Sequence, residues 1–173
     1  VSLEFEGDTF EIGEGAFYGC TSLQSVTVPK SVNLIGAYAF YDTPWLKGQS
    51  EQVIAGDGIL ISYNGNQSNV SVKDGVKKIA PYAFYENKAL KSVSMPSSVY
   101  VIGLRSFMGC ENLATVKYPD CLKFIDEEAF AKCTALSSIY LPKSVQHLGK
   151  GAFAGCISLT RAEMGGNLQR VYV

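Results

Sequence analysis

Cysteine and histidine are the residues of this sequence whose side chains most often perform chemistry, and the cysteines are regularly placed. Cys20, Cys110, Cys133 and Cys156 each follow a phenylalanine by three residues. They lack the short paired spacing that zinc sites favour. Equivalent positions elsewhere hold Thr43 and Asn87. We therefore interpret the four cysteines as reduced, buried residues that satisfy a backbone group at a turn, with disulfides as the alternative, and we predict no metal.

Acid/base and nucleophilic chemistry finds little support in the other polar residues. His147 is the only histidine. Its equivalents in the other repeats described below are Leu34, Lys78, Val101 and Phe124. A catalytic base needs partner residues that position it, and a repeat position occupied by such different residues provides none. Asp126-Glu127-Glu128 is interpreted as a solvated turn. Because phosphate-loop, HExxH and GxSxG motifs are also missing, we predict no catalytic residue, no cofactor-binding residue, no cofactor and no enzyme.

The element that positions all these residues is a repeat of 23 residues. An Ala-Phe pair, or Ser-Phe at Ser106, returns along the chain at intervals of 23, 44, 23, 23 and 23 residues. Its phenylalanines are Phe17, Phe40, Phe84, Phe107, Phe130 and Phe153. Self-similarity at this period is typical of stacked-repeat proteins, which favours binding or scaffolding over catalysis. We expect the phenylalanine rings to form a stack inside the core.

Two further apolar columns predict one short strand in each coil. The first column holds Leu3, Val26, Val70, Val93, Val116, Ile139 and Ala162. The second holds Phe5, Val28, Val72, Met95, Tyr118, Leu141 and Met164. The columns are two residues apart, so both side chains of a strand point to one face. About seven parallel strands are therefore expected.

Glycine follows an Ile/Leu column that precedes each phenylalanine by five residues. It stands at Gly13, Gly36, Gly103 and Gly149, whereas Ala80 and Asp126 occupy the same place in two copies. A strict requirement for positive φ would not accept alanine readily. We therefore expect crowding between coils, or a tight turn, to be the constraint on this column.

The unit LxxVxVPxSVxxIGxxAFxxCxx resembles the BspA-like leucine-rich repeats, a class also described from treponemal proteins. Residues 23–40 show it, and it recurs after residue 79, so the resemblance covers essentially the whole chain. It implies a right-handed leucine-rich-repeat solenoid with a concave parallel β-sheet and short helical or 3-10 turns on the other side. It also implies a secreted or cell-surface protein of adhesive function. The implied partner is a host matrix, plasma or microbial surface protein.

One copy carries extra residues. We treat residues 1–173 as a single leucine-rich-repeat domain with an insertion at 47–69 in the second full repeat. Gly56-Asp57-Gly58 joins two β-prone runs and predicts a hairpin. The hairpin either covers one edge of a coil or forms a functional protrusion. Because Val1–Phe5 and Leu168–Val171 each begin or end within a coil, we expect the chain to be part of a longer array, or its ends to be covered by other segments or neighbours.

Composition excludes two classes of partner. The net charge is −1, the pI is about 5.9, and lysines and arginines are scattered. A nucleic-acid binder would show a basic stripe or patch. No apolar stretch approaches the ~18 residues that a membrane helix needs. We therefore predict no nucleic acid and no membrane span, and the sequence leaves the oligomeric state open.

The residues free to recognise a partner flank the inward columns of the strands. In the middle of the chain they are mostly serine and threonine, which are good solvent-facing strand formers. The C-terminal corner differs. Its candidate ligand-binding residues are Lys117, Tyr140, Arg161 and Glu163. Tyrosine and arginine are enriched at interface hot spots, so we predict a protein-binding module, with a structural spacer that projects another domain as the alternative.

Overall fold

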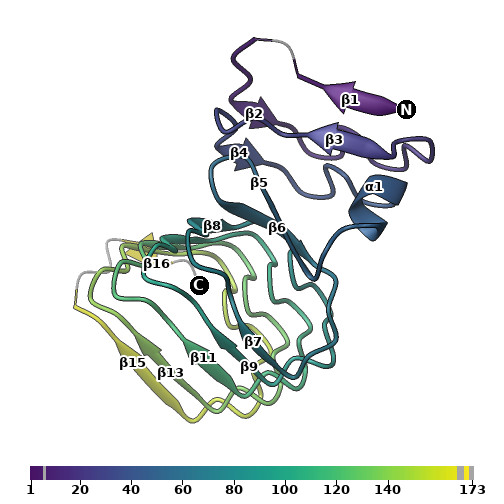
Figure 1. Ribbon diagram of the computed structural model, residues 1–173. Coiled ribbons are helices and arrows are strands. Elements are labelled where there is room, and N and C mark those ends of the chain that lie inside the picture. The colour runs from purple at the N-terminus through teal and green to yellow at the C-terminus, as the bar shows by residue number, and fades with distance from the viewer. Residues whose placement is uncertain (6, 167–169, 172–173) are drawn as a thin grey trace.

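The computed structural model describes residues 1–5, 7–166 and 170–171, which wind into a β-solenoid of about seven turns. Figure 1 shows the coils following one another from the purple N-terminus to the yellow C-terminal coils. The first coils are seen from the side, whereas the later coils are seen closer to end-on. The stack therefore changes direction near the strands labelled β5 and β6. The predicted fold class is confirmed.

The predicted strands form in every expected place. They are β1 (Ser2–Glu4), β3 (Ser25–Thr27), β7 (Asn69–Ser71), β9 (Ser92–Ser94), β11 (Thr115–Lys117), β13 (Ser138–Leu141) and β15 (Arg161–Met164). Neighbours pair in parallel one repeat apart, as in Val70 with Val93 and Val93 with Val116. They form three ladders in place of one sheet: β1-β3, β7-β9-β11 and β13-β15. The break between β3 and β7 coincides with the insertion.

A second set of parallel strands, which the sequence did not predict, runs through the Ile/Leu column. Its two-residue members are β2 (Glu11–Ile12), β4 (Leu34–Ile35), β8 (Lys78–Ile79), β10 (Val101–Ile102), β12 (Phe124–Ile125), β14 (His147–Leu148) and β16 (Arg170–Val171). β2 pairs with β4, and the others join a seven-stranded sheet in the order β16-β14-β12-β10-β8-β6-β5. A strand of two residues is too short to show an alternating pattern. The sequence therefore revealed the Ile/Leu column but did not indicate that it forms strands. Leu168, which we placed in the last coil, lies outside the described residues.

The turns that carry the phenylalanines are not helical, contrary to the expected helical or 3-10 segments. Residues two before and two after each repeat phenylalanine adopt φ between 50° and 75°. Seven of these twelve positions are not glycine: Tyr38, Asp42, Tyr82, Glu86, Arg105, Glu128 and Lys132. A left-handed residue at each side ends the helical hydrogen-bond pattern after a single turn.

The core is built by aromatic stacking along the coils. Phe84, Phe107 and Phe130 are fully buried, and consecutive rings lie 4.7 and 5.0 Å apart. Phe153 continues this stack at 5.4 Å. Phe17 and Phe40 form a separate pair at 5.3 Å. The predicted ring stack is thus confirmed, in two segments.

A short helix precedes the insertion, and the insertion itself contains a hairpin. Helix α1 (Pro44–Lys47) begins at Thr43, whose side-chain oxygen accepts a hydrogen bond from the Leu46 amide. Strands β5 (Gln52–Ala55) and β6 (Ile59–Tyr63) pair in antiparallel fashion, and β6 also pairs in parallel with β8. The Tyr63 ring stacks on Phe84 at 4.9 Å. One strand of the hairpin thus takes the place of a coil. In the described chain, no helix is long and apolar enough to cross a membrane.

The cysteines behave largely as expected. The Cys110, Cys133 and Cys156 thiols are buried and donate to the carbonyls of Phe84, Phe107 and Phe130 at 3.0, 3.2 and 3.2 Å. Burial raises the pKa of the Cys110 thiol to about 12, so it stays protonated. Cys20 is the exception. It is exposed.

Candidate functional site

The predicted C-terminal corner lies on the outward faces of β13 and β15. These strands pair so that Ser138 faces Arg161 and Tyr140 faces Glu163. Tyr140 is 49% exposed, and Arg161 and Glu163 are exposed as well. The strand alternation expected from the sequence holds on β13, where the inward neighbours Ile139 and Leu141 are buried, whereas all four residues of β15 are exposed.

Three of the four candidate residues contact one another. The Arg161 guanidinium lies over the Tyr140 ring, 5.4 Å from its centroid. Its Nη2 atom donates to Glu163 Oε1 at 2.5 Å, and its Nε atom donates to the same oxygen at 3.0 Å. The hydrogen bond to Glu163 raises the pKa of the Arg161 guanidinium above its ordinary value. Lys117 is exposed on β11, in a different ladder, and within the described residues no hydrogen bond, ion pair or cation–π contact joins it to the other three.

A hollow of about 540 Å³ opens beside this cluster. Tyr140 and Glu163 contribute to its wall. The rest of the lining comes from Asp120, Leu141, Pro142, Lys143, Ser144, Met164 and Gly165. Met164 is 49% exposed, so the hollow presents apolar surface next to charge. Such a combination suits a protein ligand better than a small reacting molecule.

Asp126 and His147, which were considered for acid/base chemistry, interact electrostatically. Asp126 is half-buried, and burial raises the pKa of its carboxyl while the nearby charge of His147 lowers it. Neither residue lines the corner hollow or the cleft described below. Over residues 1–5, 7–166 and 170–171, no group of three or more His, Cys, Asp or Glu side chains could hold a metal ion.

A second feature, missed by the sequence reasoning, is a cleft of about 580 Å³ at the insertion. Its walls are the turn at Phe40 and the turn at Phe84, with Ile61, Ser62 and Tyr63 between them. Six tyrosines line it: Tyr18, Tyr38, Tyr41, Tyr63, Tyr82 and Tyr85. We call this feature the tyrosine cleft.

The tyrosine rings form a connected network. Tyr38 meets Tyr82 across the cleft with ring centroids 4.3 Å apart, and Tyr18 stacks on Tyr41 at 5.8 Å. Tyr41 also contacts Tyr38 edge-on at 5.5 Å. Burial, followed by a hydrogen bond with Tyr82, raises the pKa of the Tyr38 hydroxyl, which therefore stays neutral. On the far side, Arg105 donates to the Tyr82 hydroxyl at 2.9 Å and pairs with Glu128.

The repeat columns contained a signal for this cleft. Tyr18, Tyr41 and Tyr85 each follow a repeat phenylalanine by one residue, and Tyr38 and Tyr82 each precede one by two. In the C-terminal coils the same columns hold no tyrosine. The clustering was visible in the sequence, but the gap that opens it was not, because the gap depends on how the insertion packs.

The sequence matches the BspA type leucine-rich repeat region in six copies, over residues 1–49 and 61–172. The chain belongs to the BspA-type leucine-rich repeat family. Its matches to solved structures agree with this. A leucine-rich repeat protein of T. pallidum is 33% identical, with a TM-score of 0.52, over 60% of this chain and 62% of that protein. A search of curated proteins gave no match.

Two further structures resemble this BspA-type chain. A leucine-rich cell surface protein of Faecalibacterium prausnitzii is 25% identical, with a TM-score of 0.53, over 99% of this chain and 63% of that one. The pneumococcal vaccine antigen PcpA has a TM-score of 0.70 over 95% of this chain, and its 24% identity shows likeness of fold alone. The chain spans 62% of the T. pallidum protein and 44% of PcpA, so it corresponds to part of each.

Proposed function

We propose that this BspA-type chain is a non-enzymatic, protein-binding module of a secreted or cell-surface protein, and that it adheres to host or microbial proteins. The observation that carries the proposal is the joined cluster of Tyr140, Arg161 and Glu163 beside an open hollow. Two of these side chains belong to residue types that dominate binding energy at interfaces. Likeness to a leucine-rich cell surface protein supports the location.

The corner suits recognition because its geometry is held in place before any partner arrives. The Tyr140 ring and the Arg161 guanidinium stack, and Glu163 fixes the guanidinium from the side. A side chain that is already ordered loses less conformational entropy on binding. Lys117, one ladder away, would extend the charged rim of the same surface.

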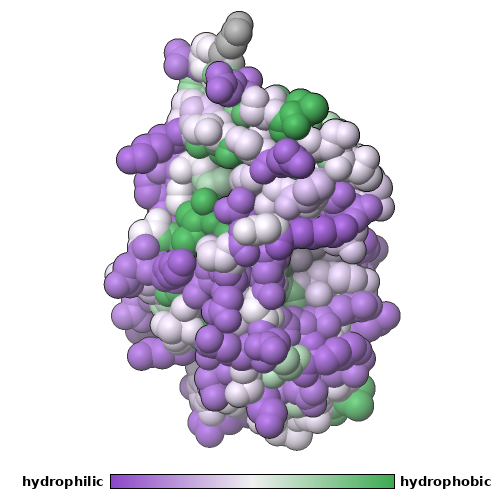
Figure 2. Space-filling model, turned by 45° about the vertical axis from the view of Figure 1, so that its right-hand side comes forward, coloured by the Kyte–Doolittle hydropathy of each residue, from purple (hydrophilic) through white to green (hydrophobic). Residues whose placement is uncertain are grey.

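A structural spacer is the second candidate, and the middle strands favour it. Their outward residues bond to each other: Ser92 Oγ donates to Asn69 Oδ1 at 2.7 Å, and Ser94 Oγ donates to Ser71 Oγ at 3.3 Å. Hydroxyl groups satisfied within the sheet offer a partner little. Figure 2 shows one face that is largely hydrophilic, with small separated hydrophobic patches, as suits a projecting stalk.

The double substitution Tyr140→Ala/Arg161→Ala tests the binding proposal. Against a panel of extracellular matrix and plasma proteins, we expect at least one to bind the wild-type chain. The double variant should bind that protein at least about tenfold more weakly, because two anchors are removed. Biolayer interferometry measures the affinities. The free energy of unfolding should change by less than about 0.5 kcal/mol per substitution, since both side chains are exposed.

Ser92→Ala is the matched control, because Ser92 is an outward strand residue far from the corner along the chain. It should leave the affinity unchanged. Equal affinity of the corner variant and the wild type would remove the corner from the binding surface. A wild-type chain that binds no protein in the panel would favour the spacer.

A further inference from the structure

The tyrosine cleft lies where the hydrogen-bond ladder between adjacent turns is interrupted. In four other coils, three amides of the phenylalanine turn donate to the next coil. At Phe17 the donors are Gly15, Phe17 and Gly19, with distances of 2.9, 2.7 and 2.9 Å. At the Phe84 turn, the amides of Tyr82, Phe84 and Glu86 donate to the next coil at 3.1, 2.7 and 2.8 Å. The turns at Phe107 and Phe130 have the same three hydrogen bonds.

The turn at Phe40 departs from this pattern. Within the described residues, the amides of Tyr38, Phe40 and Asp42 have no main-chain acceptor. Tyr38 and Asp42 have φ of 56° and 60°, close to the 60° and 53° of Tyr82 and Glu86. The backbone conformation is therefore the same as in turns that do pair. The three amides must point toward the next coil, and at this turn that direction is the cleft.

The opposite wall carries the complementary groups. In a regular stack, the carbonyls that accept at the Phe84 turn are those of Pro81, Ala83 and Tyr85. Only Ala83 accepts a main-chain bond here, from the Tyr63 amide at 2.8 Å. Within the described residues, the Pro81 and Tyr85 carbonyls accept none. Unpaired donors on one wall thus face unpaired acceptors on the other.

We propose that the tyrosine cleft binds an extended peptide segment of a partner protein, one that bears a basic side chain. Amides at alternate residues match the spacing of carbonyls along an extended peptide, and the peptide's own amides suit the free carbonyls. A cleft of this volume is within the usual range for ligand sites. In this binding mode, the peptide adds a strand-like segment at the place where the hairpin has replaced a regular coil.

The charge and rings of the cleft select a basic residue. Glu86 is the only charged residue in its lining. Asp42, at the edge, is paired with Lys47 at 2.5 Å, and Arg105 behind Tyr82 is paired with Glu128. Tyr41 and Tyr85 are 52% and 39% exposed, and no ring contact joins them in the described chain. Their faces attract a cation, and Glu86 supplies the opposite charge.

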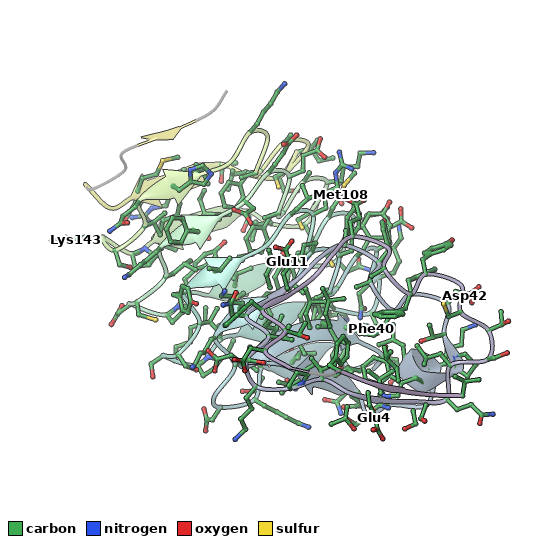
Figure 3. All side chains as sticks on the ribbon, turned by 90° about the horizontal axis from the view of Figure 1, so that it is seen from above. Glu4, Glu11, Phe40, Asp42, Met108 and Lys143 are labelled. Atoms are coloured by element: carbon green, nitrogen blue, oxygen red, sulfur yellow. The ribbon has the colours of Figure 1, made fainter. Side chains whose placement is uncertain are left out.

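The cleft is separate from the C-terminal corner. In Figure 3, Phe40 lies within the N-terminal coils and Asp42 at their outer edge, on the same side as Met108, which marks the phenylalanine turns of later coils. Lys143, which lines the corner hollow, lies on the opposite side of the view. Binding in the cleft therefore goes beyond the function proposed for the corner, and each site is tested by its own variants.

The test uses a phage-displayed library of random dodecapeptides, panned on the full chain with counter-selection against a Tyr41→Ala/Tyr85→Ala variant. Selected peptides should be enriched in arginine or lysine. Their affinity should fall at least about tenfold in the double variant, and about fivefold in Glu86→Gln. Bound peptide should also slow hydrogen exchange at residues 38–42. Cellohexaose, a linear oligosaccharide, serves as the probe of the competing ligand class.

Two variants serve as controls. Asp74→Asn removes the same charge as Glu86→Gln from an exposed turn outside the cleft, and Tyr140→Ala removes an exposed tyrosine from the other site. Both should leave peptide affinity unchanged. The proposal is overturned if panning yields no peptide that distinguishes wild type from the double variant, or if bound peptides leave residues 38–42 unprotected. Protection of those residues by cellohexaose alone would assign the cleft to carbohydrate instead.

Discussion

Replacing Phe107 by alanine is expected to lower the free energy of unfolding by about 3–5 kcal/mol. Phe107 is fully buried, and its ring lies 4.7 Å from Phe84 and 5.0 Å from Phe130. Main-chain hydrogen bonds of 2.7 and 2.8 Å join these same turns from coil to coil. They fix the spacing between the coils, which therefore cannot close fully around the space that the ring leaves. The cavity can therefore collapse only in part. Chemical denaturation measures the change.

The control for this substitution is Phe10→Ala. Phe10 is 60% exposed, so its removal should change the free energy of unfolding by no more than about 0.5 kcal/mol. In a stack of coils that contact only their neighbours, the loss at Phe107 weakens both adjoining interfaces. If the two variants were equally stable, the ring stack would not be what holds the coils together.

Replacing Gly149 by alanine is the second large effect that we expect. A Cβ atom at Gly149 would lie 2.3 Å from the Glu127 amide nitrogen and 2.4 Å from the Asp126 carbonyl carbon. Both are backbone atoms of the preceding coil, so neither can move without shifting that coil. Overpacking of this kind costs about 1–3 kcal/mol or more. In a chain of this length the melting temperature should fall by about 2–10 °C.

Gly13→Ala tests whether contact between coils is the cause. Gly13 occupies the same column, but a Cβ atom there would meet nothing within 4 Å. This variant should keep the wild-type melting temperature or raise it slightly, because alanine restricts the unfolded chain. If Gly13→Ala and Gly149→Ala were equally destabilising, a conformational preference shared by the column would be the cause, and crowding would be excluded.

Residue columns in the sequence were enough to predict what each coil repeats. The inward strand residues, the ring stack and the buried cysteines each follow from identity at a 23-residue interval. The same logic explained why Gly36 and Gly103 are small, since a Cβ atom at either would lie within 3 Å of the previous coil's backbone. Equivalent residues make the same contacts in each pair of neighbouring coils, so the sequence of one repeat predicts these contacts for every coil.

Features that depend on a break in the repeat could not be predicted in this way. The tyrosine cleft exists because β6 pairs with β8, and the amides of the turn at Phe40 are left without a main-chain acceptor in the next coil. That outcome depends on how residues 47–69 pack, and the repeat holds no information about it. Likewise, the sequence grouped Lys117 with Tyr140, but the ladders separate between β11 and β13. Strand alternation predicted which way Lys117 faces, and not which residues it touches.

Hydrogen exchange of the ligand-free chain, followed by NMR, tests the central claim most directly, which is that the insertion interrupts an otherwise continuous stack of coils. The amides of Tyr38, Phe40 and Asp42 have no main-chain acceptor in the described chain, whereas those of Tyr82, Phe84 and Glu86 are bonded to the next coil. We expect the first three to exchange at least about tenfold faster than their equivalents. Equal protection of the two sets would mean that the ladder continues through the insertion and that no cleft is open there.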